Sequence, residues 1–148
     1  MHVERTMNRS RENLFQNGQE NAVLFAAGSC WEGMDFPGDT VSSLILVRLP
    51  FPVPDPVREA EREKYGTLQE YIQKSVVPDM QMKLRQGFGR AIRTETDTCV
   101  VSVLDERAAP GGRYHKAVME ALPYCPLTES MEDVEQFIRQ KKGTEYYM

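Results

Sequence analysis

The hydrophobic positions of this chain fall into two patterns that alternate along the sequence. Short, nearly continuous apolar runs occupy residues 21–29 (NAVLFAAGS), 42–50 (SSLILVRLP) and 97–107 (DTCVVSVLDER). Runs of this length, closed by glycine, proline or charge, are typical of strands buried on both faces of a sheet. Segments with helical spacing of apolar residues, or with helix-start signals, lie between and around them. These predicted helices cover residues 5–18, 55–66, 78–93, 111–122 and 130–142.

Local signals predict where two of these helices begin. Asp55 followed by Pro56 predicts an N-cap with proline in the first helical turn. Ser130 and Asp133 predict a capping box at the start of the last helix. Strands without polar alternation, separated by helices, are typical of an α/β fold with a mostly parallel sheet. The length of 148 residues predicts a single domain.

Composition narrows the class of protein without identifying it. A content of 41% hydrophobic and 27% charged residues is ordinary for a soluble globular protein, and no apolar run reaches the length of a membrane span. The net charge of −4 argues against a generally basic nucleic-acid coat but is compatible with a local basic groove. The charged N-terminal segment lacks the apolar core of a signal peptide. Three widely separated cysteines fit reduced thiols, so we expect a cytoplasmic protein with no membrane partner.

One segment of this acidic chain concentrates positive charge. The stretch RQGFGRAIRT, residues 85–94, contains three arginines and is followed by the acidic residue Glu95. A helix over residues 79–93 would place an apolar stripe on one of its faces, and such a stripe can pack on a sheet. The predicted stripe consists of Leu84, Phe88 and Ile92.

The polar side of the same helix has candidate chemistry. Gln86, Arg90 and Arg93 are spaced by four and three residues and are therefore predicted to share a face. Gly87 and Gly89 disfavour a helix but would allow a large group to approach the backbone. Guanidinium groups on a rigid element suit a polyphosphate, to which they bind in a planar, bidentate manner. The alternative interpretation is an ordinary solvated basic face.

A second candidate region follows the first predicted buried strand. Residues 28–39, GSCWEGMDFPGD, place Glu32 and Asp35 among glycines next to Trp31. Because ligands gather at the carboxyl ends of parallel strands, these carboxylates could accept hydrogen bonds from a ribose, a base or an arginine. The alternative is a loop whose glycines serve only turns.

The sequence contains no phosphate-binding loop of its own. The pattern G-x-x-x-x-G-K-[ST] does not occur, and GFGRAI is not a G-x-G-x-x-G motif because Ile92 occupies its last position. The chain is therefore predicted to supply arginines to a nucleotide that is held elsewhere, as arginine fingers do.

These segments resemble a known family. QGFGRAIR (residues 86–93) resembles motif VI of superfamily-two helicases, Q-x-x-G-R-x-x-R, and residues 28–39 resemble motif V of the branch that contains the DinG and XPD helicases. LPFPVPDP (residues 49–56) and LDER (residues 104–107) are similar to segments of the same branch, in the same order. The resemblance covers roughly residues 20–125 and is greatest to the bacterial DinG-like proteins.

The resemblance implies a RecA-like three-layer αβα fold with a mostly parallel central sheet. Residues 1–148 would form the second motor domain of an ATP-dependent DNA helicase, with motif V at about 28–39 and motif VI at about 86–93. Members of the family clamp Mg²⁺-ATP between two such domains, and the Walker residues belong to the first. We therefore expect a chain truncated at its N-terminal side and inactive by itself. Its expected partners are that first motor domain and single-stranded or forked DNA.

The resemblance also implies roles for individual residues. Arg90 and Arg93 would reach the γ-phosphate of ATP across the cleft, and Arg93 is the preferred arginine finger. Gln86, Gly89, Gly33 and Asp35 would contact or orient the nucleotide. The remaining matched positions would serve DNA binding (Ser29, Trp31 and Glu32) and support the motif VI helix by ion pairing (Asp105 and Arg107).

Two departures from the family pattern leave an alternative open. Motifs I and II are missing, and Cys30, Cys99 and Cys125 do not provide the four cysteines of an iron–sulfur cluster, so no cluster is expected in this chain. The alternative function is a non-catalytic nucleic-acid-binding or interaction module on a RecA-like scaffold. Arg90 together with Arg93 favours the motor domain, because a pure binding module would need neither at that spacing.

Overall fold

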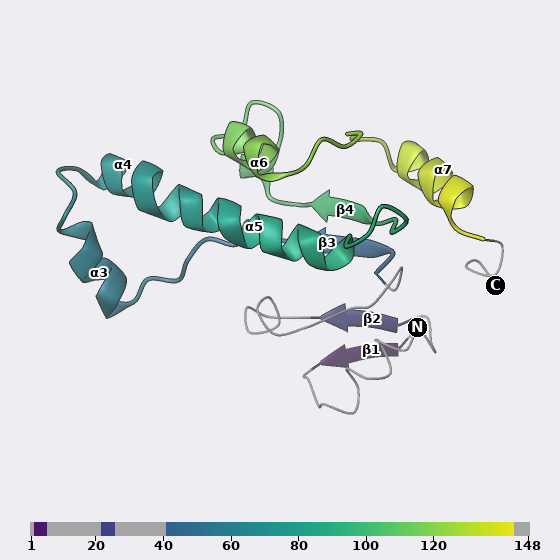
Figure 1. Ribbon diagram of the computed structural model, residues 1–148, viewed down its shortest axis with the longest axis horizontal. Coiled ribbons are helices and arrows are strands. Elements are labelled where there is room, and N and C mark those ends of the chain that lie inside the picture. Colours follow the sequence, from purple (N-terminus) through teal and green to yellow (C-terminus); the bar gives the residue numbers. More distant parts are fainter. Residues whose placement is uncertain (1, 6–21, 26–40, 144–148) are drawn as a thin grey trace. The chain divides into compact units, whose positions relative to one another are not determined.

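The computed structural model describes residues 2–5, 22–25 and 41–143 (Figure 1). Beyond Arg5, the helix predicted over residues 5–18 lies outside the described residues, as does the predicted loop over 28–39. The chain divides into two compact units. The first contains Met1–Leu44, Gly89–Ser102 and Tyr124–Met148, and the second contains Ile45–Phe88 and Val103–Pro123.

Strands β1 (His2–Arg5) and β2 (Ala22–Phe25) form a parallel pair in the first unit. The register runs from His2 opposite Ala22 to Arg5 opposite Phe25. The sequence pattern predicted β2 but not β1. The reason is that β1 has the sequence HVER, in which valine is the only strongly apolar residue, so it contains no hydrophobic run.

Strands β3 (Ser43–Leu46) and β4 (Val100–Val103) form a second pair. Leu46 is buried whereas Ile45 is 58% exposed, so β3 is not buried on both faces as predicted. Successive side chains of a strand point to opposite faces, and only the face of Leu46 is covered. The backbone hydrogen bonds advance in the same direction along both strands, which makes the pair parallel, as predicted. They join the Val100 amide to the Ser42 carbonyl and the Leu104 amide to the Leu46 carbonyl, each at 2.9 Å.

The helix predicted to begin at Pro78 begins ten residues earlier. Figure 1 shows α4 (Leu68–Tyr71) and α5 (Val77–Ala91) as one continuous run, and a π-helical turn, Ile72–Val76, joins them. The Val77 amide donates to the Ile72 carbonyl, five residues back. Proline inside a regular α-helix lacks an amide donor and clashes with the preceding turn, and the wider π-turn before Pro78 relieves both problems. Proline therefore does not mark the helix start here.

The predicted helix caps are confirmed. Helix α3 is Pro56–Arg62, and the Asp55 carboxylate accepts the Arg58 amide at 3.0 Å. Helix α7 is Met131–Lys141, and the Ser130 hydroxyl accepts the Asp133 amide at 3.3 Å. The reciprocal half of this capping box runs through Thr128, whose hydroxyl donates to Asp133 at 2.6 Å and accepts the Ser130 amide at 3.0 Å.

The remaining elements follow β4. A 3₁₀ turn, Glu106–Ala108, leads to the short helix α6 (His115–Ala121), which lies within its predicted range. None of the described helices is both long enough and apolar enough to cross a membrane.

The buried side of α5 differs from the predicted stripe. Phe88 and Ile92 are only half-buried, whereas the buried positions are spaced by four, three and four residues. A constant spacing of four drifts by about 40° per step around an α-helix, so an alternation of four and three follows one face more closely. The buried positions are Met80, Leu84, Gly87 and Ala91, and the side chains of Met80 and Leu84 are fully buried.

Polar contacts hold α5 to its neighbours in the second unit. Arg58 of α3 forms an ion pair with Asp79 at 2.7 Å, and this hydrogen-bonded contact raises the pKa of the guanidinium. The side-chain amide of Gln81 donates to the Ala117 carbonyl of α6 at 2.8 Å. Each of these contacts joins elements that are distant in sequence, so α5 is fixed along its N-terminal half.

Candidate functional site

The C-terminal half of α5 carries three of the residues predicted to face a nucleotide. Gln86 and Gly89 are exposed, whereas Arg90 is half-buried and its Nε atom is buried. A Cβ atom at Gly89 would meet no heavy atom within 4 Å in the described part of the chain. Gly89 is therefore an open position on the helix, where a large group has room to approach the backbone.

Gly87 does not share this property. It is buried on the packed side of α5. Gly87 is therefore not an exposed position of the helix, in contrast to Gly89.

Arg93 lies beyond the helix on which it was predicted. Helix α5 ends at Ala91, so Arg93 shares no helical face with Gln86 and Arg90. Its backbone amide donates to the carboxylate of Asp97 at 2.9 Å, and the residue is exposed. A turn rather than the helix therefore sets the direction of this arginine.

Asp97 organises that turn. Its carboxylate also accepts the backbone amide of Thr94 at 3.0 Å and the Thr94 hydroxyl at 2.8 Å. The hydrogen bond from the Arg93 amide, followed by those from Thr94, lowers the pKa of Asp97 below its ordinary value. Asp97 was not among the predicted site residues, although TETD, a run of turn-forming residues directly after the arginines, was a usable signal.

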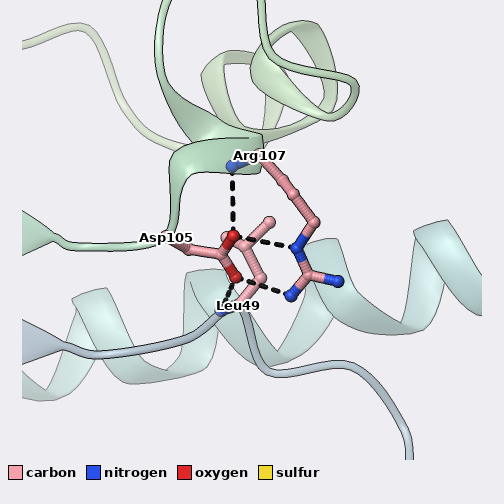
Figure 2. Close-up of polar contacts among 3 residues, drawn as sticks. All are labelled: Leu49, Asp105 and Arg107. Carbon is pink, nitrogen blue, oxygen red and sulfur yellow. Dashed lines mark hydrogen bonds and ion pairs between the residues drawn. The ribbon is translucent and has the colours of Figure 1, made fainter.

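Asp105 and Arg107, which were expected to support the motif VI helix by ion pairing, form an ion pair with each other. Figure 2 shows the Asp105 carboxylate facing the Arg107 guanidinium and the Leu49 amide. It accepts hydrogen bonds from Nε of Arg107 at 2.8 Å and from Nη2 at 2.6 Å. The Leu49 amide donates to the same carboxylate at 2.9 Å. The pair thus joins the segment after β4 to the segment after β3. The expected support of the motif VI helix by these two residues remains a prediction.

The electrostatics of this pair follow from its geometry. The Asp105 side chain is 5% exposed and that of Arg107 is 43% exposed. The hydrogen bonds from the Arg107 side chain, aided by the amides of Leu49 and Arg107, hold the pKa of Asp105 far below its ordinary value despite burial. The same contact raises the pKa of Arg107. Both groups are therefore charged at neutral pH and mutually satisfied, which indicates a structural role.

Aromatic residues complete this cluster. The Arg107 guanidinium lies 5.0 Å from the ring centroid of Phe51, and the Phe51 and Tyr114 rings are 4.9 Å apart. A Cβ atom at Gly112 would lie 2.6 Å from the Arg107 carbonyl oxygen, so only glycine fits the tight return of the chain there. Sequence reasoning missed these three residues, because their roles depend on contacts more than 50 residues apart or on backbone packing.

The other predicted site residues lie outside the described residues. They are Ser29, Trp31, Glu32, Gly33 and Asp35. Their predicted contacts with DNA and nucleotide therefore remain predictions.

Within residues 2–5, 22–25 and 41–143, no group of three or more histidine, cysteine, aspartate or glutamate side chains could hold a metal ion. Cys125 is a free thiol.

Comparison with known proteins identifies the family. The sequence profile described as the helicase C-terminal domain matches residues 2–144. The chain is 42% identical over 105 residues to the ATP-dependent DNA helicase DinG of Photobacterium profundum, covering 69% of this chain and 15% of the relative. It is 35% identical over 123 residues to the ATP-dependent DNA helicase YoaA of Escherichia coli, covering 80% and 19%. The 3'-5' exonuclease DinG of Bacillus subtilis is 33% identical over 126 residues, covering 82% and 13%.

The profile covers nearly the whole chain, and the chain spans less than one fifth of the length of these relatives. The parallel strand pairs and the long α5 agree with the α/β, RecA-like architecture that the resemblance implied. The chain therefore belongs to the helicase C-terminal domain family, in which it is a DinG-like member.

Proposed function

We propose that this chain is the second motor domain of an ATP-dependent DNA helicase and supplies Arg90 and Arg93 to ATP bound by a first motor domain. The observation that carries the proposal is the end of α5, where the open Gly89 and the half-buried Arg90 are followed, three residues after Arg90, by the exposed Arg93. Family membership supports the same function, since two of the relatives are named ATP-dependent DNA helicases.

The chemistry of the proposed step depends on charge. As the γ-phosphoryl group leaves, negative charge spreads over its oxygens, and a guanidinium that contacts them stabilises the transition state. Arginine suits this role because it is always protonated and donates in a planar fork. Arg90 has part of its side chain buried, so we assign it the steadier contact and Arg93 the contact made across the cleft.

The nucleotide would be shared between the two motor domains. In this chain Gln86 and the open backbone at Gly89 fit a position beside the phosphates, and Gly33 and Asp35 are proposed to contact the nucleotide from the loop over 28–39. We assign the ligands of Mg²⁺ to the first motor domain, whose Walker residues this sequence lacks. When bound, Mg²⁺ neutralises part of the phosphate charge, and the arginines stabilise the negative charge that is left on the phosphates.

The single-stranded DNA track is proposed to include Ser29, Trp31 and Glu32. Replacing Trp31 by alanine is expected to weaken single-strand binding about tenfold, because stacking of one base on an aromatic ring contributes roughly 1–3 kcal/mol. ATP affinity should remain close to that of the parent, and Trp31→Phe should retain most of the DNA affinity. Fluorescence anisotropy with a labelled oligonucleotide measures the effect. A larger loss of ATP affinity than of DNA affinity would remove Trp31 from the track.

Steady-state ATP hydrolysis tests the proposed function directly. The protein that contains this chain together with a first motor domain is expected to hydrolyse ATP several-fold faster when single-stranded DNA is added. The same preparation should unwind a forked duplex only in the presence of ATP. Hydrolysis that is absent with and without DNA, in a folded protein that still binds DNA, would instead favour the non-catalytic binding module.

A further inference from the structure

The turn that follows α5 closes around a single side chain. The Asp97 carboxylate accepts three hydrogen bonds. Oδ2 accepts the backbone amides of Arg93 and Thr94, and Oδ1 accepts the Thr94 hydroxyl. In return, the Asp97 amide donates to the Thr94 carbonyl at 3.2 Å. The hydroxyls of Thr94 and Thr96 lie 2.9 Å apart. Residues 93–97 are thus closed by hydrogen bonds from both the backbone and the side chains.

The position of this carboxylate is not explained by the helix before it. The C-terminal end of an α-helix carries partial negative charge and favours cations, so an acidic residue just beyond it is disfavoured by the helix dipole. Asp97 is compensated by the amides that point at it, a local arrangement that aspartate forms readily in turns. Asp97 therefore binds the backbone amides of Arg93 and Thr94 and does not serve to cap the helix dipole.

This arrangement matters because Arg93 is exposed and lies outside the helix. An arginine on an unanchored segment would lose both backbone and side-chain freedom when it met a phosphate, and that entropy would oppose the contact. With its amide held at 2.9 Å from Asp97, the Cα–Cβ direction of Arg93 is set before any ligand arrives. The backbone part of that entropy is therefore already lost before the contact is made.

We propose that Asp97 is a positioning residue for ATP hydrolysis, which aims Arg93 by anchoring its backbone amide. The proposal rests on the function proposed above, because it needs Arg93 to act on the transferring phosphoryl group. It adds an acidic residue that touches neither ATP nor DNA. Asp97 acts through the preorganisation of the arginine, and small displacements of a positioned group are costly in catalysis.

The test measures turnover in the protein that carries this chain and a first motor domain. Asp97→Ala is expected to lower kcat about 10- to 100-fold and to leave the KM for ATP nearly unchanged, since the contact of Arg93 is made in the transition state. Asp97→Asn retains one oxygen acceptor and should recover part of the loss. The matched control is Glu95→Gln, which removes the same charge from an exposed position in the same turn and should leave kcat within twofold.

Two further measurements separate positioning from a general loss of structure. Amide hydrogen exchange should accelerate at Arg93 and Thr94 in Asp97→Ala but not within α5. In an Arg93→Ala background, adding Asp97→Ala should lower kcat no further, because the group that it aims is gone. A further decrease in that background, or an unchanged exchange rate at Arg93, would overturn the positioning role.

The possible results also distinguish this proposal from the one on which it rests. If Arg93→Ala abolishes turnover while Asp97→Ala stays within twofold of the parent, the positioning role fails and the arginine finger stands. If Arg93→Ala itself leaves turnover normal, the finger assignment fails, and the positioning role fails with it.

Discussion

Replacing Arg93 by alanine is expected to lower DNA-stimulated ATP turnover by about 10³-fold in the protein that combines this chain with a first motor domain. Arginine fingers contribute roughly 10³–10⁵ to turnover in GTPases, where the same charge develops on the transferring phosphoryl group. The side chain is exposed and lies past the end of α5, so its removal should not disturb the packed positions of that helix. The loss should appear in kcat, with little change in the KM for ATP.

Two variants make this result interpretable. Arg85→Ala removes the same charge from an exposed position on α5 and should leave turnover within twofold. Arg93→Lys retains a positive charge but not the planar fork, so it should recover only part of the activity. Arg90→Ala is a less direct test because the Nε atom of Arg90 is buried, and its loss can also affect folding. Turnover of Arg93→Ala equal to that of Arg85→Ala would exclude Arg93 as the finger.

Replacing Asp105 by alanine is expected to lower the free energy of unfolding of this chain by about 2–3 kcal/mol. The substitution removes the acceptor of the Leu49 amide and the partner of Arg107 at a carboxylate that is nearly inaccessible to solvent. Hydrogen bonds to a charged group contribute roughly 1.5–3 kcal/mol each, and the share of Arg107 is reduced because its side chain is partly solvated. Urea unfolding followed by circular dichroism measures the change.

The neighbouring residues provide the controls for Asp105. Glu106→Ala removes an exposed carboxylate one residue away and should change stability by less than about 0.5 kcal/mol. Arg107→Ala should cost less than Asp105→Ala, because the Leu49 amide keeps its acceptor. Equal effects of Asp105→Ala and Glu106→Ala would contradict the role of the buried carboxylate.

The same carboxylate gives the stability of the chain a defined pH dependence. Its pKa is lowered in the folded state, so its contribution is complete above the unfolded-state pKa of about 3.9. The contribution is then lost as the pH falls through the lower folded-state pKa. The difference in unfolding free energy between the parent and Asp105→Asn should therefore shrink as the pH is lowered from about 5 toward 2.

Features that depend on local chemistry could be predicted from the sequence. The caps at Asp55 and Ser130 are formed by atoms three residues apart, and strands β2, β3 and β4 lie within the predicted apolar runs. The family resemblance rested on local motifs too, and the profile match confirms it. Strand β1 was not predicted, because a four-residue strand with one apolar position has no hydrophobic periodicity.

Features that depend on the balance between competing local structures could not be predicted. Proline at position 78 is typical of a helix start, but the π-helical turn before it allows the helical run to continue through it. Because α5 ends at Ala91, Arg93 lies outside the helix and does not share a helical face with Arg90. Ion pairing by Asp105 and Arg107 was expected from the family resemblance, whereas their pairing with each other and the contact with Leu49 required the fold.

The π-helical turn before Pro78 has a further consequence for the helical run. Buried positions before and after it are Tyr71, Ser75, Met80 and Leu84, and the only step of five residues falls between Ser75 and Met80. The turn thus behaves as a one-residue insertion that leaves the buried sides of α4 and α5 in phase. Loss of one residue within Ile72–Val76 would restore regular spacing to this side, but it would place the proline inside an ordinary α-helix. The length of this turn is therefore constrained by the proline that follows it.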